Sequence, residues 1–390
     1  MNIKTILLGA PIKNSQLKHE KLSKVWGLPI MASDALSSVA YAIEEILLVL
    51  LPVFGMLAFK KIPFIVFPIL GLLTILIISY CQIIDHYPGG GGAYAVASEN
   101  IGKRIAVLCA AALIIDYILT VAVSISSASA AITSAFPDLS SKKILISLLF
   151  VSIITLINLR GIRESSKIFG LPTYIFIGSM ALLIVVGLIK LITGDLHQIN
   201  YKASILPKET LEGIRLLILL KAFSSGCSAM TGVEAISNSV PNFKDPSTKN
   251  AKTILVILGG LIVFIFGGIS ILAINLRVIV VEGHTVLSQI SSAVFGNNII
   301  YYVIQVFTAL ILILAANTAF NGLPQLLYIL AHDGFVPRQF SSRGSKLSFS
   351  NGIVFIFISA CLLILAFKSD VHKLIPLYSV GVFMSFTIAQ

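Results

Sequence analysis

Ten long apolar runs constrain the fold of this chain more than any other feature of its sequence. Most of them approach or exceed the length of about 20 residues that a helix needs to cross a bilayer. Because lipid offers no partner to an unpaired backbone amide, the runs must be helical, and they are too long for the alternating strands of a membrane barrel. The runs are 28–53, 62–81, 105–135, 144–159, 170–193, 213–240, 252–276, 300–331, 349–367 and 371–390.

Composition supports the same class. Hydrophobic residues make up 57% of the 390 residues and charged residues 12%, with a mean hydropathy of +0.97. Soluble domains carry about 25% charged residues. These values exclude a soluble enzyme, a disordered chain and a disulfide scaffold, and predict an all-α polytopic membrane protein. The net charge of +11 is scattered over short loops, so we expect lipid and no nucleic acid as partner.

Basic residues also predict the orientation. With a cytoplasmic N-terminal segment, 1–26, the inside carries 16 of the 28 Lys and Arg residues and the outside 11. We therefore expect a multi-pass protein of the cell membrane. Segment 284–297 is amphipathic and too short to span, and we expect it in the outer interface. The last run ends at Gln390 without a basic anchor, so we expect the sequence to continue in a longer chain.

Two segments, in the first and sixth runs, are crowded with Gly, Ser and Ala and carry acids: 27–45 and 222–240. Broken helices at corresponding places in two halves indicate an inverted-repeat transporter with a site near the membrane midplane. Close helix packing is the alternative explanation for the small residues. The acids favour the transporter, because a carboxylate in hydrocarbon is costly unless it is used or paired. We expect a first repeat over 27–193 and a second over 212–390.

Three mid-span acids are the main candidates for function: Asp34, Asp116 and Glu234. Each has a hydroxyl group one or two turns away on the same helix face. Hard oxygen ligands of this kind suit alkali cations or protons. Structural acids, hydrogen-bonded between helices, are the alternative for each acid taken alone. The hydroxyl groups belong to Tyr41, Thr120 and Thr231.

Other polar residues in the runs are less specific. Ser38, Asn317 and Asn321 are candidates for additional lining, and the two asparagines could equally serve as hydrogen-bonding glue between helices. Lys221 either neutralises an acid or reaches the outer surface. The sequence has no HExxH, GxSxG or P-loop motif, so we expect neither an enzyme nor a cofactor.

Several motifs resemble a known group of transporters. Two loop motifs, PGGGGAY at 88–94 and AHDGFVP at 331–337, are similar to those of the amino acid–polyamine–organocation superfamily. Four further motifs resemble the KimA-type potassium importers, which are related to the KUP branch. These motifs are SDALSSVAY at 33–41, DYILTVAVS at 116–124, NLRGIRES at 158–165 and SSGCSAMTGVEAISNSVPNFK at 224–244.

The resemblance implies a LeuT-like fold of five-plus-five inverted repeats with helices one and six broken. It implies secondary K⁺ import, coupled to H⁺ as a symport. It also implies further spans and a cytoplasmic domain after residue 390, through which members form homodimers. The cation-binding positions of the family match Asp34, Tyr41, Asp116, Thr120, Thr231 and Glu234.

Three other functions stay open on the residues alone. An amino acid or polyamine permease would share the fold; Asp34 would repel a substrate carboxylate but could pair with an amine. A receptor or scaffold would leave the three mid-span acids without a purpose. A channel is a further alternative, although the sequence has no filter of the TVGYG kind.

Overall fold

The computed structural model describes residues 21–389 apart from 91, 161–165, 197–211 and 343–348. Its described residues are almost entirely helical, and the only β-pairings among them are two isolated bridges. The helices are α2 (Lys24–Phe54), α3 (Ala58–Lys61), α4 (Pro63–His86), α5 (Ala93–Asn100), α6 (Lys103–Ala135), α7 (Lys143–Leu159), α8 (Ser166–Thr193), α9 (Glu212–Gly226), α10 (Ala235–Asn238), α11 (Ser247–Leu276), α12 (Val286–Phe295), α13 (Ile299–His332), α14 (Ser350–Ala366) and α15 (Val371–Ala389).

Each predicted apolar run contains helix, which confirms the all-α membrane class. In the described part of the chain, nine helical segments are long and apolar enough to cross a membrane. The one remaining predicted run, 349–367, corresponds to α14, an apolar helix of 17 residues that is shorter than those nine segments. Large apolar side chains cover the outside of the bundle, and Phe64, Phe67 and Ile192 are among the most exposed. Such a surface suits lipid and not water.

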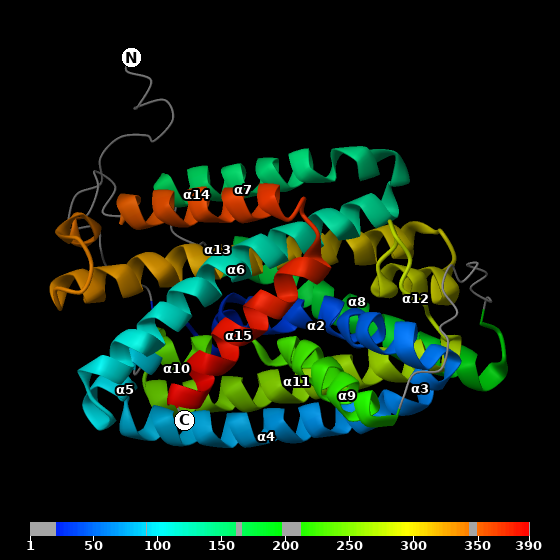
Figure 1. Ribbon diagram of the computed structural model, residues 1–390, viewed down its shortest axis with the longest axis horizontal. Helices are drawn as coiled ribbons and strands as arrows, with labels where there is room; N and C mark the ends of the chain where they lie inside the picture. Colours follow the sequence, from blue (N-terminus) through cyan, green and yellow to red (C-terminus); the bar gives the residue numbers. More distant parts are fainter. Residues whose placement is uncertain (1–20, 91, 161–165, 197–211, 343–348, 390) are drawn as a thin grey trace, which may run out of the picture.

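Two long helices form the centre of the bundle. Figure 1 shows α6 running beside α13, with α15 crossing α6. Helix α2 packs against α8, α9, α11 and α13, while α7 and α14 pair at one edge. Residues 32–47 of α2 and 119–129 of α6 are buried without interruption, and many of them are Ala or Ser. Small residues allow helix backbones to approach closely, which explains why these stretches lie inside.

On one side of the bundle, the start of the first span is hydrogen-bonded to the end of the sixth span. The backbone amide of Leu22 donates to the carbonyl of Asn242 at 2.7 Å, and the amide of Lys244 donates to Leu22 at 2.9 Å. Nearby, Lys21 pairs with Asp245 at 2.8 Å. The segment that leads into α2 is therefore fixed to the segment that follows α10.

Segment 284–297 forms a helix, α12, as its pattern predicts, but its placement in the outer interface is wrong. Eight of its ten residues are buried, and it packs against α2, α6, α8, α11 and α13. Its polar residues find partners inside the protein: Ser288 bonds the Tyr301 hydroxyl at 2.8 Å, and Gln305 donates to Ser291 at 3.1 Å. With its polar face satisfied in this way, the helix can be covered by the bundle.

Candidate functional site

The sixth span is broken, as its sequence predicts. Helix α9 ends at Gly226, a 3₁₀ turn follows over Cys227–Met230, and helix resumes only at Ala235. Between them, Thr231 is extended and Gly232 has φ +80°. Only glycine adopts such a left-handed conformation without strain. The sequence therefore interrupts this span where its small residues gather.

The predicted break in the first span is absent. Helix α2 is continuous from Lys24 to Phe54, although Pro29 lacks an amide hydrogen. The carbonyl of Val25, which Pro29 cannot bond, accepts instead from the Tyr174 hydroxyl at 2.5 Å. The serines that indicated a break also bond their own helix: Ser37, for example, donates to the carbonyl of Asp34 at 2.8 Å. Small hydroxyl residues at this place supplement the helix without opening it.

Asp34 lies directly against the break of the sixth span. A Cβ atom on Gly232 would come within 2.7 Å of the carboxyl carbon of Asp34 and within 2.8 Å of the amide nitrogen of Ala35. Glycine at 232 is therefore required by the close approach of the two spans as well as by its φ angle. This contact brings the first and sixth spans together at their acids.

The three predicted acids face one region. Asp34 and Asp116 are 8% and 3% exposed, and Glu234 is half-buried. Asp116 interacts electrostatically with both other acids, and Asp34 interacts with Glu234. One oxygen of Glu234 accepts a hydrogen bond from the backbone amide of Gly232. The three carboxyl groups thus form one acidic region inside the bundle.

The predicted hydroxyl residues complete the same region. Tyr41 lies near Thr231 and interacts electrostatically with Asp34 and Asp116, while Thr120 lies near Asp116. All six sequence-predicted site residues thus gather in one region, although they come from α2, α6 and the broken sixth span.

Some oxygen atoms in this region lack a hydrogen-bond partner within the described residues. They include Oδ1 of Asp116, Oε2 of Glu234 and the hydroxyl of Ser228. Among those same residues, no three His, Cys, Asp or Glu side chains are grouped closely enough to hold one metal ion. The carboxylates therefore line a region and do not form a single coordination shell. A cation there must also draw on hydroxyl and carbonyl oxygens, as alkali cations do.

Two tyrosines in the region were not predicted. Tyr378 of α15 is 1% exposed, accepts from the Thr120 hydroxyl at 3.4 Å and interacts with Asp34 and Asp116. Tyr117 interacts with all three acids. A phenol in the middle of an apolar run, or next to a mid-span acid, was the available signal for both.

Within the described part of the chain, the residues predicted as additional lining are not among the groups that interact with the three acids. The hydroxyl of Ser38 donates to the Ala35 carbonyl at 2.8 Å, inside its own helix. Asn317 accepts from Asn158 of α7 at 2.7 Å, which fits the alternative role of helix–helix glue. Asn321 and Lys221 are exposed, and Lys221 is not among the charged partners of the three acids.

A cavity of about 570 Å³ leads to this region from the end of the bundle where α2 terminates. Tyr41 forms part of its wall, together with Glu44, Glu45, Ser127 and His372. Since Tyr41 also lies near Thr231 and interacts with two of the acids, the cavity reaches the edge of the acidic region.

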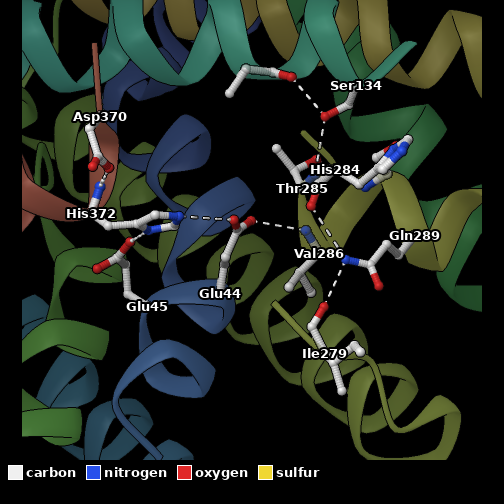
Figure 2. A network of polar contacts seen from close by, with 12 residues as sticks. Glu44, Glu45, Ser134, Ile279, His284, Thr285, Val286, Gln289, Asp370 and His372 are labelled. Atoms are coloured by element: carbon white, nitrogen blue, oxygen red, sulfur yellow. Dashed lines mark hydrogen bonds and ion pairs between the residues drawn. The ribbon is translucent and has the colours of Figure 1, made fainter. Parts of the chain in front are cut away.

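A polar network crosses the wall of the cavity, as Figure 2 shows. The imidazole of His372 lies between two carboxylates, with Nδ1 at 2.6 Å from Glu45 and Nε2 at 3.5 Å from Glu44. The second oxygen of Glu44 accepts from the backbone amide of Val286, the first residue of α12, at 2.9 Å. Three elements, α2, α12 and α15, meet in this network.

Comparisons with known proteins agree with this architecture. The amino acid permease family matches residues 30–390. The potassium transporter KimA of Bacillus subtilis (strain 168) is 47% identical over 389 residues, which cover all of this chain and 64% of that protein. The chain therefore spans a little under two thirds of that relative. The family match and the all-helical bundle support the predicted LeuT-like fold.

Proposed function

Because the chain belongs to the amino acid permease family, we propose that it forms the membrane part of a potassium transporter that imports K⁺ together with H⁺. The relative at 47% identity is a potassium transporter, which supports K⁺ as the cargo. The proposal places the N-terminus in the cytoplasm, so that the cavity faces outward.

One observation carries the proposal: Asp34, Asp116 and Glu234 interact inside the bundle, and their principal charged partners are other carboxylates. Uncompensated carboxylates in a membrane interior are costly, and a bound cation offsets that cost. Oxygen atoms on Asp116 and Glu234 that have no hydrogen-bond partner among the described residues are available as ligands. An anionic substrate would be repelled from the same place.

Each group has a role in the proposed transport. Asp34 and Tyr41 bind K⁺ beside the broken span, and Asp116 with Thr120 forms the opposite wall. Glu234, with Thr231, carries the proton. The position of Glu234 in the broken segment supports this assignment, because a rearrangement of that segment would change its surroundings.

The test is K⁺ uptake by a bacterial strain that lacks its own K⁺ importers and expresses the full-length protein. We expect Asp34→Asn to abolish uptake at limiting K⁺ with unchanged surface expression. Asp138→Asn, a matched change of an exposed acid, should leave uptake within twofold of the wild type. Equal uptake by both variants would remove Asp34 from the site, and no uptake by the wild type would refute K⁺ transport.

An amine substrate is the second candidate, because the family that matches is named for amino acid permeases. The acids would then pair with a substrate ammonium group. Excess unlabelled polyamines or amino acids should leave K⁺ uptake unchanged if K⁺ is the cargo. Competition at micromolar concentrations, with no K⁺ flux in liposomes, would favour the amine.

A further inference from the structure

The cavity wall holds titratable groups that the proposed cation site does not use. Glu45 is 1% exposed, yet its carboxylate reaches the cavity and lies 2.6 Å from Nδ1 of His372. Glu45 is also one helical turn from Tyr41 on α2 and interacts with it electrostatically. A carboxylate paired with an imidazole thus stands between the open part of the cavity and the acidic region.

A second observation indicates that the cavity can hold polar molecules. Ser127 of α6 is 6% exposed and lines the cavity, but its hydroxyl has no hydrogen-bond partner within the described residues. A buried hydroxyl of this kind is normally satisfied by protein or water. The cavity can therefore hold water, which can carry protons to the half-buried His372 on its wall.

Other charged groups face the pair from the elements packed around it. Glu44, also on α2, lies 3.5 Å from Nε2 of the same imidazole. Lys143 of α7 interacts with Glu44 and with Asp370, and Asp370 accepts from the backbone amide of His372 at 3.1 Å. Farther along the cavity wall lie Glu282, His284 and Lys368. This set holds three acids and three bases, and the charged groups in contact with the imidazole itself are the carboxylates of Glu44 and Glu45.

We propose that the Glu45–His372 pair is the proton-uptake site of the transporter, through which the coupled proton enters from the cavity. This inference rests on the proposed symport. A proton from cavity water bonds to Nε2 of His372, which then donates toward Glu44. The proton on Nδ1 passes to Oε1 of Glu45. The ring gains one proton and loses one, and Glu45 holds the proton one turn above Tyr41.

The geometry explains why these two residues, and not the neighbouring acids, receive the proton. The Nδ1–Glu45 contact of 2.6 Å is short enough for direct transfer, whereas the Nε2–Glu44 contact of 3.5 Å is not. Glu44 is also engaged with the amide of α12 at 2.9 Å. Glu45 alone combines contact with the imidazole and proximity to Tyr41.

The experiment measures proton entry directly. The purified full-length protein is placed in liposomes that contain a pH-sensitive dye, and K⁺ influx is started by an inward K⁺ gradient. We expect the wild type to acidify the interior. Glu45→Gln and His372→Gln should reduce acidification per K⁺ at least fivefold. The K⁺ concentration that half-maximally protects each protein against heat should stay within twofold of the wild type.

Glu45→Gln keeps the length of the side chain and an oxygen that accepts from His372, so it tests protonation and not packing. Matched controls are Glu282→Gln, an exposed acid on the same cavity, and His332→Gln, an exposed histidine at the end of α13. Both controls should acidify as the wild type does. If Glu45→Gln and His372→Gln do the same, the inference is wrong while the symport stands. If the wild type moves K⁺ without acidification, the proposed symport fails and this inference with it.

Discussion

Replacement of Gly232 by alanine tests how closely the broken sixth span must approach Asp34. Two features of the structure oppose any side chain at this position. The φ angle is +80°, and an added Cβ would stand 2.7 Å from the Asp34 carboxyl carbon and 2.8 Å from the Ala35 nitrogen. Since ordinary contacts begin near 3.4 Å, the carboxylate would have to move by about 0.7 Å.

The free-energy cost of Gly232→Ala can be estimated from the backbone conformation and from the added contact. A left-handed conformation costs a residue other than glycine about 1–2 kcal/mol. Overpacking of one methyl group in a tight interior costs about 1–3 kcal/mol. Gly232→Ala should therefore cost roughly 2–5 kcal/mol in the arrangement that holds Asp34 against the break. If only 2 kcal/mol of this falls on the K⁺-bound state, affinity drops about 30-fold.

The assay is K⁺ uptake over a range of external K⁺, normalised to protein at the cell surface. The half-saturating concentration should rise at least tenfold in Gly232→Ala. Gly260→Ala is the matched control, because Gly260 lies on the exposed side of α11 with nothing within 4 Å of an added Cβ. The control should behave as the wild type. A Gly232→Ala protein that reaches the surface and keeps its half-saturation within twofold would refute the reasoning.

Three further results are expected. Glu44→Ala removes the acceptor of the first amide of α12, which should destabilise the protein by about 1–3 kcal/mol and speed hydrogen exchange at the start of that helix. Tyr94→Phe removes the 2.6 Å hydrogen bond from the Tyr94 hydroxyl to Asp333. Because burial raises the pKa of Tyr94 to about 12, this bond should stabilise the wild type up to about pH 10 and progressively less above it. The difference between the melting temperatures of the two proteins, measured over this pH range, tests the expectation. Glu282→Cys should react with an impermeant maleimide added outside intact cells, and Glu99→Cys only after permeabilisation; the reverse pattern would contradict a cytoplasmic N-terminus.

Much of the fold could be predicted from the sequence, because a bilayer leaves few choices. Apolar runs must be helices, so the class and the spans follow from composition and length. The break of the sixth span was also predictable, since Gly226 and Gly232 lie in a stretch of small residues that carries an acid, Glu234. The acids could be singled out because a carboxylate in a span is rare without a function.

What the sequence could not supply was the partners of individual groups. Tyr378 meets Thr120 across 258 positions of the chain, a contact that no local pattern encodes. The continuity of α2 depends on Tyr174 of α8, which satisfies a carbonyl that Pro29 leaves open. The burial of α12 depends likewise on partners such as Tyr301, and an amphipathic pattern alone does not distinguish lipid from protein as the covering surface.

The difference between the two acid-bearing spans determines where substitutions should matter. Helix α2 is continuous through the region of the acids, so the first span contributes to the site through side chains, those of Asp34 and Tyr41. In the sixth span the α-helix is interrupted between Gly226 and Ala235, and there the backbone can contribute as well. Changes that spare side-chain chemistry but alter backbone freedom should therefore be harmless in the first span and damaging at Gly232.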